Sequence, residues 1–296
     1  MLTWKLWRAL NRSPRHLPLY RRVYLRQEAD ERPLSVRIPM FWLVKNLSLI
    51  LLPVALILLG APIMAILYYL SMLMTPLLLP LANTLYGFVH ANNTSGYIAR
   101  ERDHQTYDVI CTSPAGTLGM HWSYCAGWLH AHVVYHYLIL GLLAIGLFAS
   151  LFGLPAEMVF GEDGAPLLTV LVRGLSLGIL FVLDYAQTMV ISSLTAMLVP
   201  AYAENESNAR LWASSLFLLL QVSVYLPTLL LSSLALPNAL ALLGVQAAVS
   251  AIIVPVLSVV FFAALREIII AGMWQRVAQQ LNTTSVELDA LSRAAV

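Results

Sequence analysis

The longest apolar block of this chain, residues 40–91, reads MFWLVKNLSLILLPVALILLGAPIMAILYYLSMLMTPLLLPLANTLYGFVHA. A helix needs about 20 apolar residues to cross the hydrocarbon core of a bilayer, so this block is long enough for two crossings. The turn between them has two candidate positions, residues 60–62 (GAP) and residues 75–80 (TPLLLP), because proline removes a backbone donor and interrupts helices. The block therefore predicts two membrane-spanning helices joined by a short turn.

Further apolar blocks follow, each long enough to cross a membrane as a helix: residues 120–156, 165–202, 211–236 and 238–265. Hydrophobic residues make up 59% of the chain and charged residues 11%. An ordinary soluble domain has roughly 45–50% apolar and about 25% charged residues. We therefore predict an all-α, polytopic membrane protein with six transmembrane helices.

Charge placement orients these helices. Residues 1–39 contain nine basic and three acidic residues, and such an excess of arginine and lysine marks a cytoplasmic segment. Six spans then place both termini in the cytoplasm. They also place segments 95–119 and 203–210 inside and the acidic segment 153–166 outside.

The N-terminal residues have an amphipathic pattern. Leucines and a tryptophan recur at helical spacing within residues 2–12, while Lys5, Arg8 and Arg12 lie on other faces. A helix of this kind can lie at the level of the lipid headgroups. The chain is thus expected to have three regions: a cytoplasmic basic amphipathic segment 1–39, a transmembrane domain 40–272 and a cytoplasmic C-terminal tail 273–296.

Several classes of chemistry have no motif in this sequence. Its two lysines, Lys5 and Lys45, do not follow a glycine-rich turn, so a phosphate-binding loop is lacking and the chain cannot hydrolyse ATP by itself. No hydrolase or zinc-protease motif is visible either. The positive charge is concentrated at one membrane face, which favours lipid over nucleic acid as its partner. We therefore expect neither an enzyme nor a resident cofactor.

A compact charged segment, RERDHQTYDVICTSP, occupies residues 100–114 between the second and third expected spans. Residues 92–95 (NNTS) favour helix caps and turns, and residues 114–116 (PAG) interrupt a helix. A short helix over residues 96–113 is therefore expected. Its mixed charges and two tyrosines suit docking in a groove on a soluble protein.

This segment resembles the E-R-E-x-G-T-x-E-x-L-x-x-T-P signature of the type-2 ABC exporter permeases, and the matching positions are Glu101, Arg102, Asp103, Thr106, Asp108, Ser113 and Pro114. The sequence departs from the signature most at Gln105, where the family has glycine. In that family the segment is the coupling helix, which ATPase subunits grip. The resemblance implies docking residues that also include Arg100 and Tyr107.

The same resemblance implies a function. The chain would be the permease subunit of an ATP-driven exporter in the plasma or inner membrane, paired with a second permease subunit in a homodimer or heterodimer. ATP and magnesium would bind to a separate ABC ATPase subunit. The coupling helix would pass the movement of that ATPase to the spans.

A second reading rests on histidines. The side chains of His121, Cys125, His132 and His136 fall on one face of the third expected span, and His90 lies on the second. Imidazoles and a thiol can bind haem or a soft metal, so the alternative function is a haem- or metal-binding membrane anchor or electron-transfer subunit. The same face can instead pack against another helix through hydrogen bonds.

Asp184 lies well inside the fourth expected span, where a carboxylate costs about 2.5–3.5 kcal/mol and normally faces a bundle interior. Arg173 is on the same helix but is too distant along it for a direct ion pair. Two roles are open for Asp184: a translocation path together with Arg173 and Gln221, or a hydrogen bond to a neighbour such as Gln221 or Tyr225. A proton-coupled carrier is a third, weaker reading, because no inverted repeat is visible.

Overall fold

The computed structural model describes the chain in separate stretches: residues 1–11, 20–21, 23–24, 60–104, 107, 116–132 and 167–282. Every regular element in these stretches is a helix. The elements are α1 (Leu2–Asn11), α4 (Gly60–Asp103), α6 (Gly116–Ala131), α8 (Leu167–Leu198), η2 (Val199–Ala201), α9 (Glu206–Leu230), η3 (Leu231–Ala235), α10 (Leu236–Leu242) and α11 (Ala247–Gln280). The expectation of an all-helical fold is confirmed for this part of the chain.

Three of these segments are long and apolar enough to cross a membrane: Val172–Ala201, Glu206–Leu242 and Val249–Gln280. They correspond to the last three expected spans. The boundary expected near residue 237 is not found, because the helix continues to Leu242 and the chain reverses at Gly244, which has a positive φ. Residues 40–59 and 133–156 of the expected first and third spans lie outside the described stretches.

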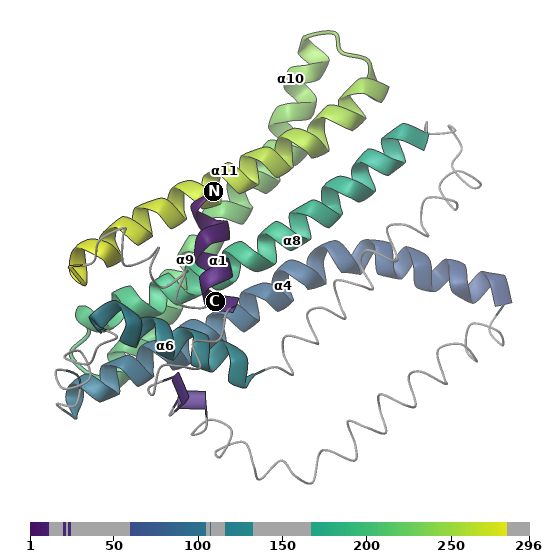
Figure 1. The fold of residues 1–296 in the computed structure, drawn as a ribbon. Coiled ribbons are helices and arrows are strands. Elements are labelled where there is room, and N and C mark those ends of the chain that lie inside the picture. Colours follow the sequence, from purple (N-terminus) through teal and green to yellow (C-terminus); the bar gives the residue numbers. More distant parts are fainter. Residues whose placement is uncertain are drawn as a thin grey trace.

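α8 is the central helix of the bundle. It packs most extensively against α11 and α4, and α4 packs in turn against α9 (Figure 1). All residues from Asp184 to Met197 are buried. The second half of α8 therefore forms the core, around which the other long helices are placed.

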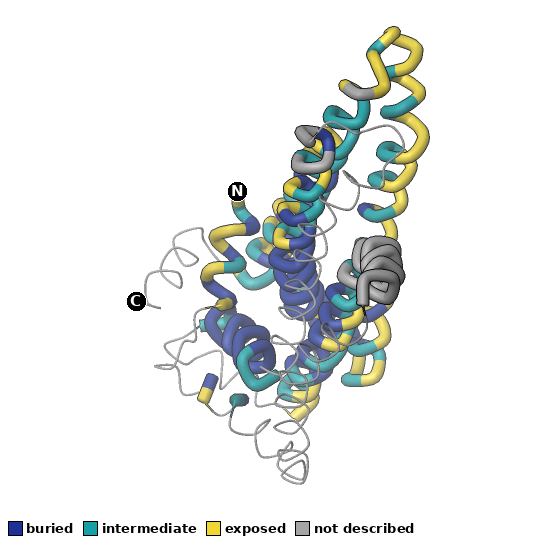
Figure 2. Tube along the Cα trace, turned by 90° about the vertical axis from the view of Figure 1, so that its right-hand side faces the viewer, coloured by how far each residue is buried: buried dark blue, intermediate teal, exposed yellow. Residues whose placement is uncertain are grey.

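Exposure is distributed unevenly along the bundle. The end formed by the last part of α9, by α10 and by the start of α11 is largely exposed, whereas the core of α8 is buried (Figure 2). The exposed residues of α9, η3, α10 and α11 in this region are mainly apolar and include Leu229, Leu234, Leu242 and Val260. Apolar faces of this extent fit helices that meet lipid or another helix rather than water.

The course of α4 differs from the expected one at two places where a helix end was predicted. It runs without interruption from Gly60 to Asp103, so no turn occurs within residues 75–80, and residues 96–103 continue this helix instead of beginning a new one. Residues 40–59 lie outside the described stretches, so the alternative turn at residues 60–62 stays a prediction. Prolines inside such a helix are tolerated where neighbouring groups satisfy the freed backbone carbonyls.

α1 lies across the bundle, next to α8 (Figure 1). Thr3, Leu6, Ala9 and Leu10 are buried, and α1 contacts α8, α11 and α6. The amphipathic helix expected from the sequence is present. Its apolar face, however, packs on other helices of this chain.

Candidate functional site

An ion pair between Asp184 of α8 and Arg266 of α11 lies in the interior of the bundle. Arg266 Nη2 is 2.8 Å from Asp184 Oδ1, and the side chains are 0% and 2% exposed. Burying two charges costs several kcal/mol per ion before their attraction is counted. Additional hydrogen bonds are therefore needed to hold this pair.

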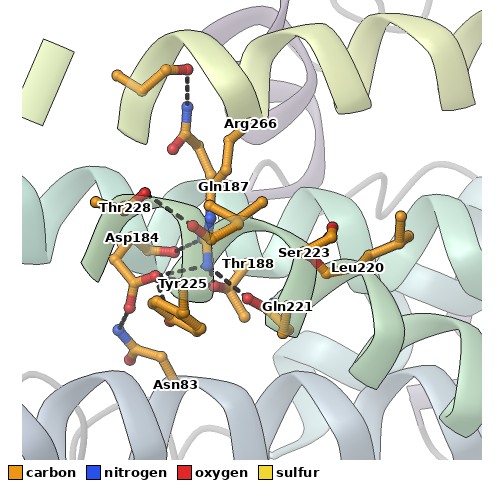
Figure 3. A network of polar contacts seen from close by, with 12 residues as sticks. Asn83, Asp184, Gln187, Thr188, Leu220, Gln221, Ser223, Tyr225, Thr228 and Arg266 are labelled. Atoms are coloured by element: carbon orange, nitrogen blue, oxygen red, sulfur yellow. Dashed lines mark hydrogen bonds and ion pairs between the residues drawn. The ribbon is translucent and has the colours of Figure 1, made fainter. Parts of the chain in front are cut away.

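Asp184 receives such bonds from two other helices (Figure 3). Asn83 of α4 donates from Nδ2 to Oδ2 at 2.7 Å, and Tyr225 of α9 donates its hydroxyl to Oδ1 at 2.7 Å. Both carboxylate oxygens are thus bonded. The carboxylate joins α4, α8, α9 and α11 at one point.

Arg266 is bonded in a similar way. Nη1 donates to Thr188 Oγ1 at 2.7 Å and to the backbone carbonyl of Asp184 at 3.0 Å, while Nη2 donates to Gln221 Oε1 at 2.5 Å. The guanidinium also lies over two aromatic rings, 4.5 Å from the centroid of Phe262 and 5.1 Å from that of Tyr225. Cation–π contacts of this kind become stronger when water is excluded.

Four buried atoms around the ion pair have no protein partner within the described residues: Asn83 Oδ1, Gln187 Oε1, Gln221 Nε2 and Arg266 Nε. Two of them are acceptors and two are donors. Their neighbours Asp184 and Arg266 fix the orientations of the Asn83 and Gln221 amides. Since buried polar groups are usually bonded, these four atoms are hydrogen-bonding capacity that the described residues around the ion pair leave unused.

The structure brings together part of the predicted translocation path. Asp184 and Gln221 both contact Arg266, and the predicted hydrogen bond from Tyr225 to Asp184 is confirmed. Arg173 is exposed near the start of α8, about 16 Å from Asp184 along the helix axis, and does not join this cluster. As expected from its distance, Arg173 makes no ion pair with Asp184, and Arg266 of α11, which was not among the predicted residues, makes that pair instead.

His90 belongs to a second buried group. Its Nε2 is 3.0 Å from Ser193 Oγ, which itself donates to the carbonyl of Met189, and its Nδ1 is 3.4 Å from Thr94 Oγ1. With the serine hydrogen on the Met189 carbonyl, the His90 tautomer that fits both contacts donates from Nε2 and accepts at Nδ1. The contact between His90 and Ser193 joins α4 to α8.

Among the described residues, the histidines of the alternative function lie at two places, His90 and His132 beside Trp128 and His121 beside Tyr107. Trp128 stacks on His132 with ring centroids 4.0 Å apart, and its centroid is 4.8 Å from that of His90. His121 instead lies against Tyr107, with centroids 5.8 Å apart. Cys125 is buried and contacts the carbonyl of Ser193.

No group of three or more histidine, cysteine, aspartate or glutamate side chains that could hold a metal occurs in the described stretches. His136 lies outside them. In the part of the chain described, the histidines of this face make hydrogen bonds and ring contacts.

The predicted docking segment begins at the end of α4, next to the connection between α8 and α9. Arg102 donates from Nη1 to the carbonyl of Pro200 at 2.6 Å and from Nη2 to the carbonyl of Ala203. Arg100 and Asp103 are exposed, and Glu101 is half-buried. Arg102 therefore bonds the end of α4 to the connection between α8 and α9.

The remaining predicted docking residues are only partly described. Tyr107 is half-buried against His121, whereas Thr106, Asp108, Ser113 and Pro114 lie outside the described stretches. A close approach also joins α4 to α9 near this end. A Cβ on Gly96 would lie 2.4 Å from Arg210 Nε, and Ser95 donates to the carbonyl of Ala209 at 3.0 Å.

Comparison of this chain with protein-family models, with curated proteins and with solved structures finds no match.

Proposed function

We propose that this chain is the membrane permease subunit of an ATP-driven exporter, with a separate ABC ATPase docking at the end of α4. In this proposal the complete chain has six spans, and both termini lie in the cytoplasm beneath the plasma or inner membrane. A second permease subunit completes the translocation unit. The chain itself carries out no hydrolysis.

The observation that carries this proposal is the position of Arg102. The exposed Arg100 and Asp103 offer charges to a soluble partner, while Arg102 between them bonds the carbonyls of Pro200 and Ala203. A force applied to the end of α4 is thereby passed to the end of α8. This connection is what an ATPase needs if it is to move more than one helix.

Movement of α8 would act on the buried ion pair between Asp184 and Arg266. Pro200 follows α8, and Asp184 lies sixteen residues earlier, which corresponds to about 24 Å along the helix. A shift of α8 against α11 changes the geometry of the Asp184–Arg266 pair, because each partner is on one of these helices. The polar part of a substrate would then bond to the amides of Asn83 and Gln221.

Reversal of the charge at Glu101 tests the docking role. We expect Glu101→Lys to retain membrane insertion but to abolish the substrate-stimulated ATP hydrolysis of the purified complex, because charge complementarity at the docking surface is reversed. Arg173→Glu is the matched control. It changes the charge by the same amount at an exposed position near the start of α8, and hydrolysis should remain.

The measurement is ATP hydrolysis by the tagged permease together with its co-purified ATPase, whose phosphate-binding loop identifies it. Normal association and normal stimulation in Glu101→Lys would show that the segment is not the docking site. Absence of any ATPase in the preparation of the unchanged protein would contradict the exporter function itself.

A further inference from the structure

The N-terminus of α1 is capped by a side chain from the opposite end of the sequence. The Glu267 carboxylate accepts from the backbone N–H groups of Leu2 and Thr3, the latter at 3.3 Å, and also from the Thr3 hydroxyl. The first N–H groups of a helix have no partner within it, and a negative charge there is favourable. Glu267 thus supplies from α11 the cap that a local residue normally provides.

The rest of α1 is fixed on α8 and α6. Leu6 and Leu10 are fully buried, and the rings of Trp7 and Tyr185 meet edge to face with centroids 5.3 Å apart. At the other end of α1, the carbonyl of Asn11 is 3.2 Å from His130 Nε2. The contacts therefore extend over the whole length of α1.

Two of the residues that contact α1 are direct sequence neighbours of the residues of the buried ion pair. Glu267 follows Arg266 on α11, and Tyr185 follows Asp184 on α8. Successive residues of a helix point about 100° apart. On α11, Arg266 therefore bonds Asp184 while Glu267 bonds α1. On α8, Asp184 bonds Arg266 while Tyr185 contacts α1. α1 consequently bridges the same two helices that the ion pair joins.

The outer face of docked α1 is charged. Trp4, Lys5 and Arg8 are exposed, opposite the buried leucines. A lysine or arginine that faces hydrocarbon costs about 2.5–3.5 kcal/mol, so this side of the bundle must meet headgroups or water. α1 accordingly has a polar environment into which it can be released.

We propose that α1 is a releasable intramolecular clasp that docks on Glu267 and Tyr185 and holds α8 against α11 while the Asp184–Arg266 pair is formed. Release of α1 and loosening of the ion pair favour each other, because both depend on the same packing of α8 on α11. The clasp would thus control how easily these two helices separate.

Labelling of a buried thiol tests this proposal. Ala9 is 4% exposed, so in a Cys111→Ser, Cys125→Ala background the thiol of Ala9→Cys should react slowly with a water-soluble maleimide. Lys5→Cys, on the exposed face of the same helix, should react fast. Equal rates at the two positions in the full-length protein would overturn the docked state.

Loss of the cap should then release α1. We expect Glu267→Ala to speed the labelling of Ala9→Cys roughly tenfold, in line with the loss of a helix cap. Glu206→Ala, which removes an acid that pairs with Arg210 and does not touch α1, is the matched control and should leave the rate unchanged. An unchanged rate in Glu267→Ala would refute the capping role.

The link to the ion pair has its own test. Asp184→Asn should also speed the labelling of Ala9→Cys, whereas Arg173→Met should not, and equal rates in these two variants would overturn the clasp. A crosslinking measurement tests docking without Asp184→Asn, in case that variant does not fold. In the same cysteine-free background, a short bismaleimide should join Trp7→Cys to Tyr185→Cys, because these two rings are in contact. It should not join the exposed Trp4→Cys to Tyr185→Cys. Absence of this selectivity would count against docking. Since the readout is thiol chemistry, a failed exporter function would leave these results unaffected.

Discussion

Removal of Arg266 should destabilise the protein more than any exposed substitution, because it leaves Asp184 as a buried charge without its partner. The carboxylate keeps its bonds from Asn83 and Tyr225 but loses the ion pair at 2.8 Å. Breaking a buried pair in this way costs about 3–5 kcal/mol. We therefore expect Arg266→Met to lower the free energy of unfolding by that amount.

In a Cys111→Ser background, the assay can use the buried thiol of Cys125. Cys125 is 0% exposed, so a thiol-reactive dye reports its exposure as detergent-solubilised protein is heated. With about 2–4 °C per kcal/mol for a chain of 150–250 residues, Arg266→Met should melt roughly 10 °C lower. The matched control Arg173→Met changes an exposed arginine and should shift the melting temperature little.

A double variant separates the ion pair from packing. Asp184→Asn with Arg266→Met leaves no buried charge at this point, and replacement of a whole buried pair is often close to neutral. The double variant should therefore melt above Arg266→Met alone. If Arg266→Met melts at the same temperature as Arg173→Met, the ion pair does not hold these helices together.

Two further predictions concern packing and capping, each measured by the same melting assay. Gly87→Ala should cost about 1–3 kcal/mol, because the new Cβ would lie 2.6 Å from a ring carbon of Phe217, whereas Gly272→Ala meets nothing within 4 Å and should stabilise its helix by up to about 1 kcal/mol; equal effects would contradict the close approach of α4 to α9. Asn205→Ala should cost about 1 kcal/mol, because its side chain caps α9 by accepting from the backbone N–H of Asn208 at 2.9 Å, and Asn205→Asp should retain the cap. A loss in Asn205→Asp as large as in Asn205→Ala would show that capping is not the cause.

The candidate site was partly predictable from sequence, because a carboxylate inside an apolar span needs polar neighbours. That reasoning identified Asp184 and named Gln221 and Tyr225 as candidate neighbours. It did not name Arg266, which lies more than 80 residues after Asp184 in the sequence. In the structure the two side chains point to different neighbours, Arg266 to α8 and Glu267 to α1.

The end of α4 was not predictable from local preferences. Residues 92–95 have the composition of a helix cap, yet Thr94 and Ser95 lie inside the helix and are buried. Thr94 bonds His90, and Ser95 bonds the carbonyl of Ala209. Contacts with other helices therefore use the hydroxyl groups that would otherwise favour a helix end.

The position of α1 shows a similar limit. An amphipathic pattern predicts a helix with one apolar face but does not say whether lipid or protein covers that face. The contacts of Leu6, Leu10 and Trp7 with other helices answer this question. No sequence pattern near residues 2–11 points to Glu267, which is more than 250 residues away.

The central claim, that a cytoplasmic ATPase docks on the exposed end of α4, is tested most directly by a photo-crosslinking amino acid at Asp103 in intact membranes. Asp103 is exposed and adjacent to Arg102. The claim predicts a crosslink to a soluble chain with a phosphate-binding loop, formed from position 103 and not from the exposed Leu242 at the other end of the bundle. Crosslinks only to other membrane helices, or labelling of position 103 by impermeant reagents from outside the cell, would contradict it.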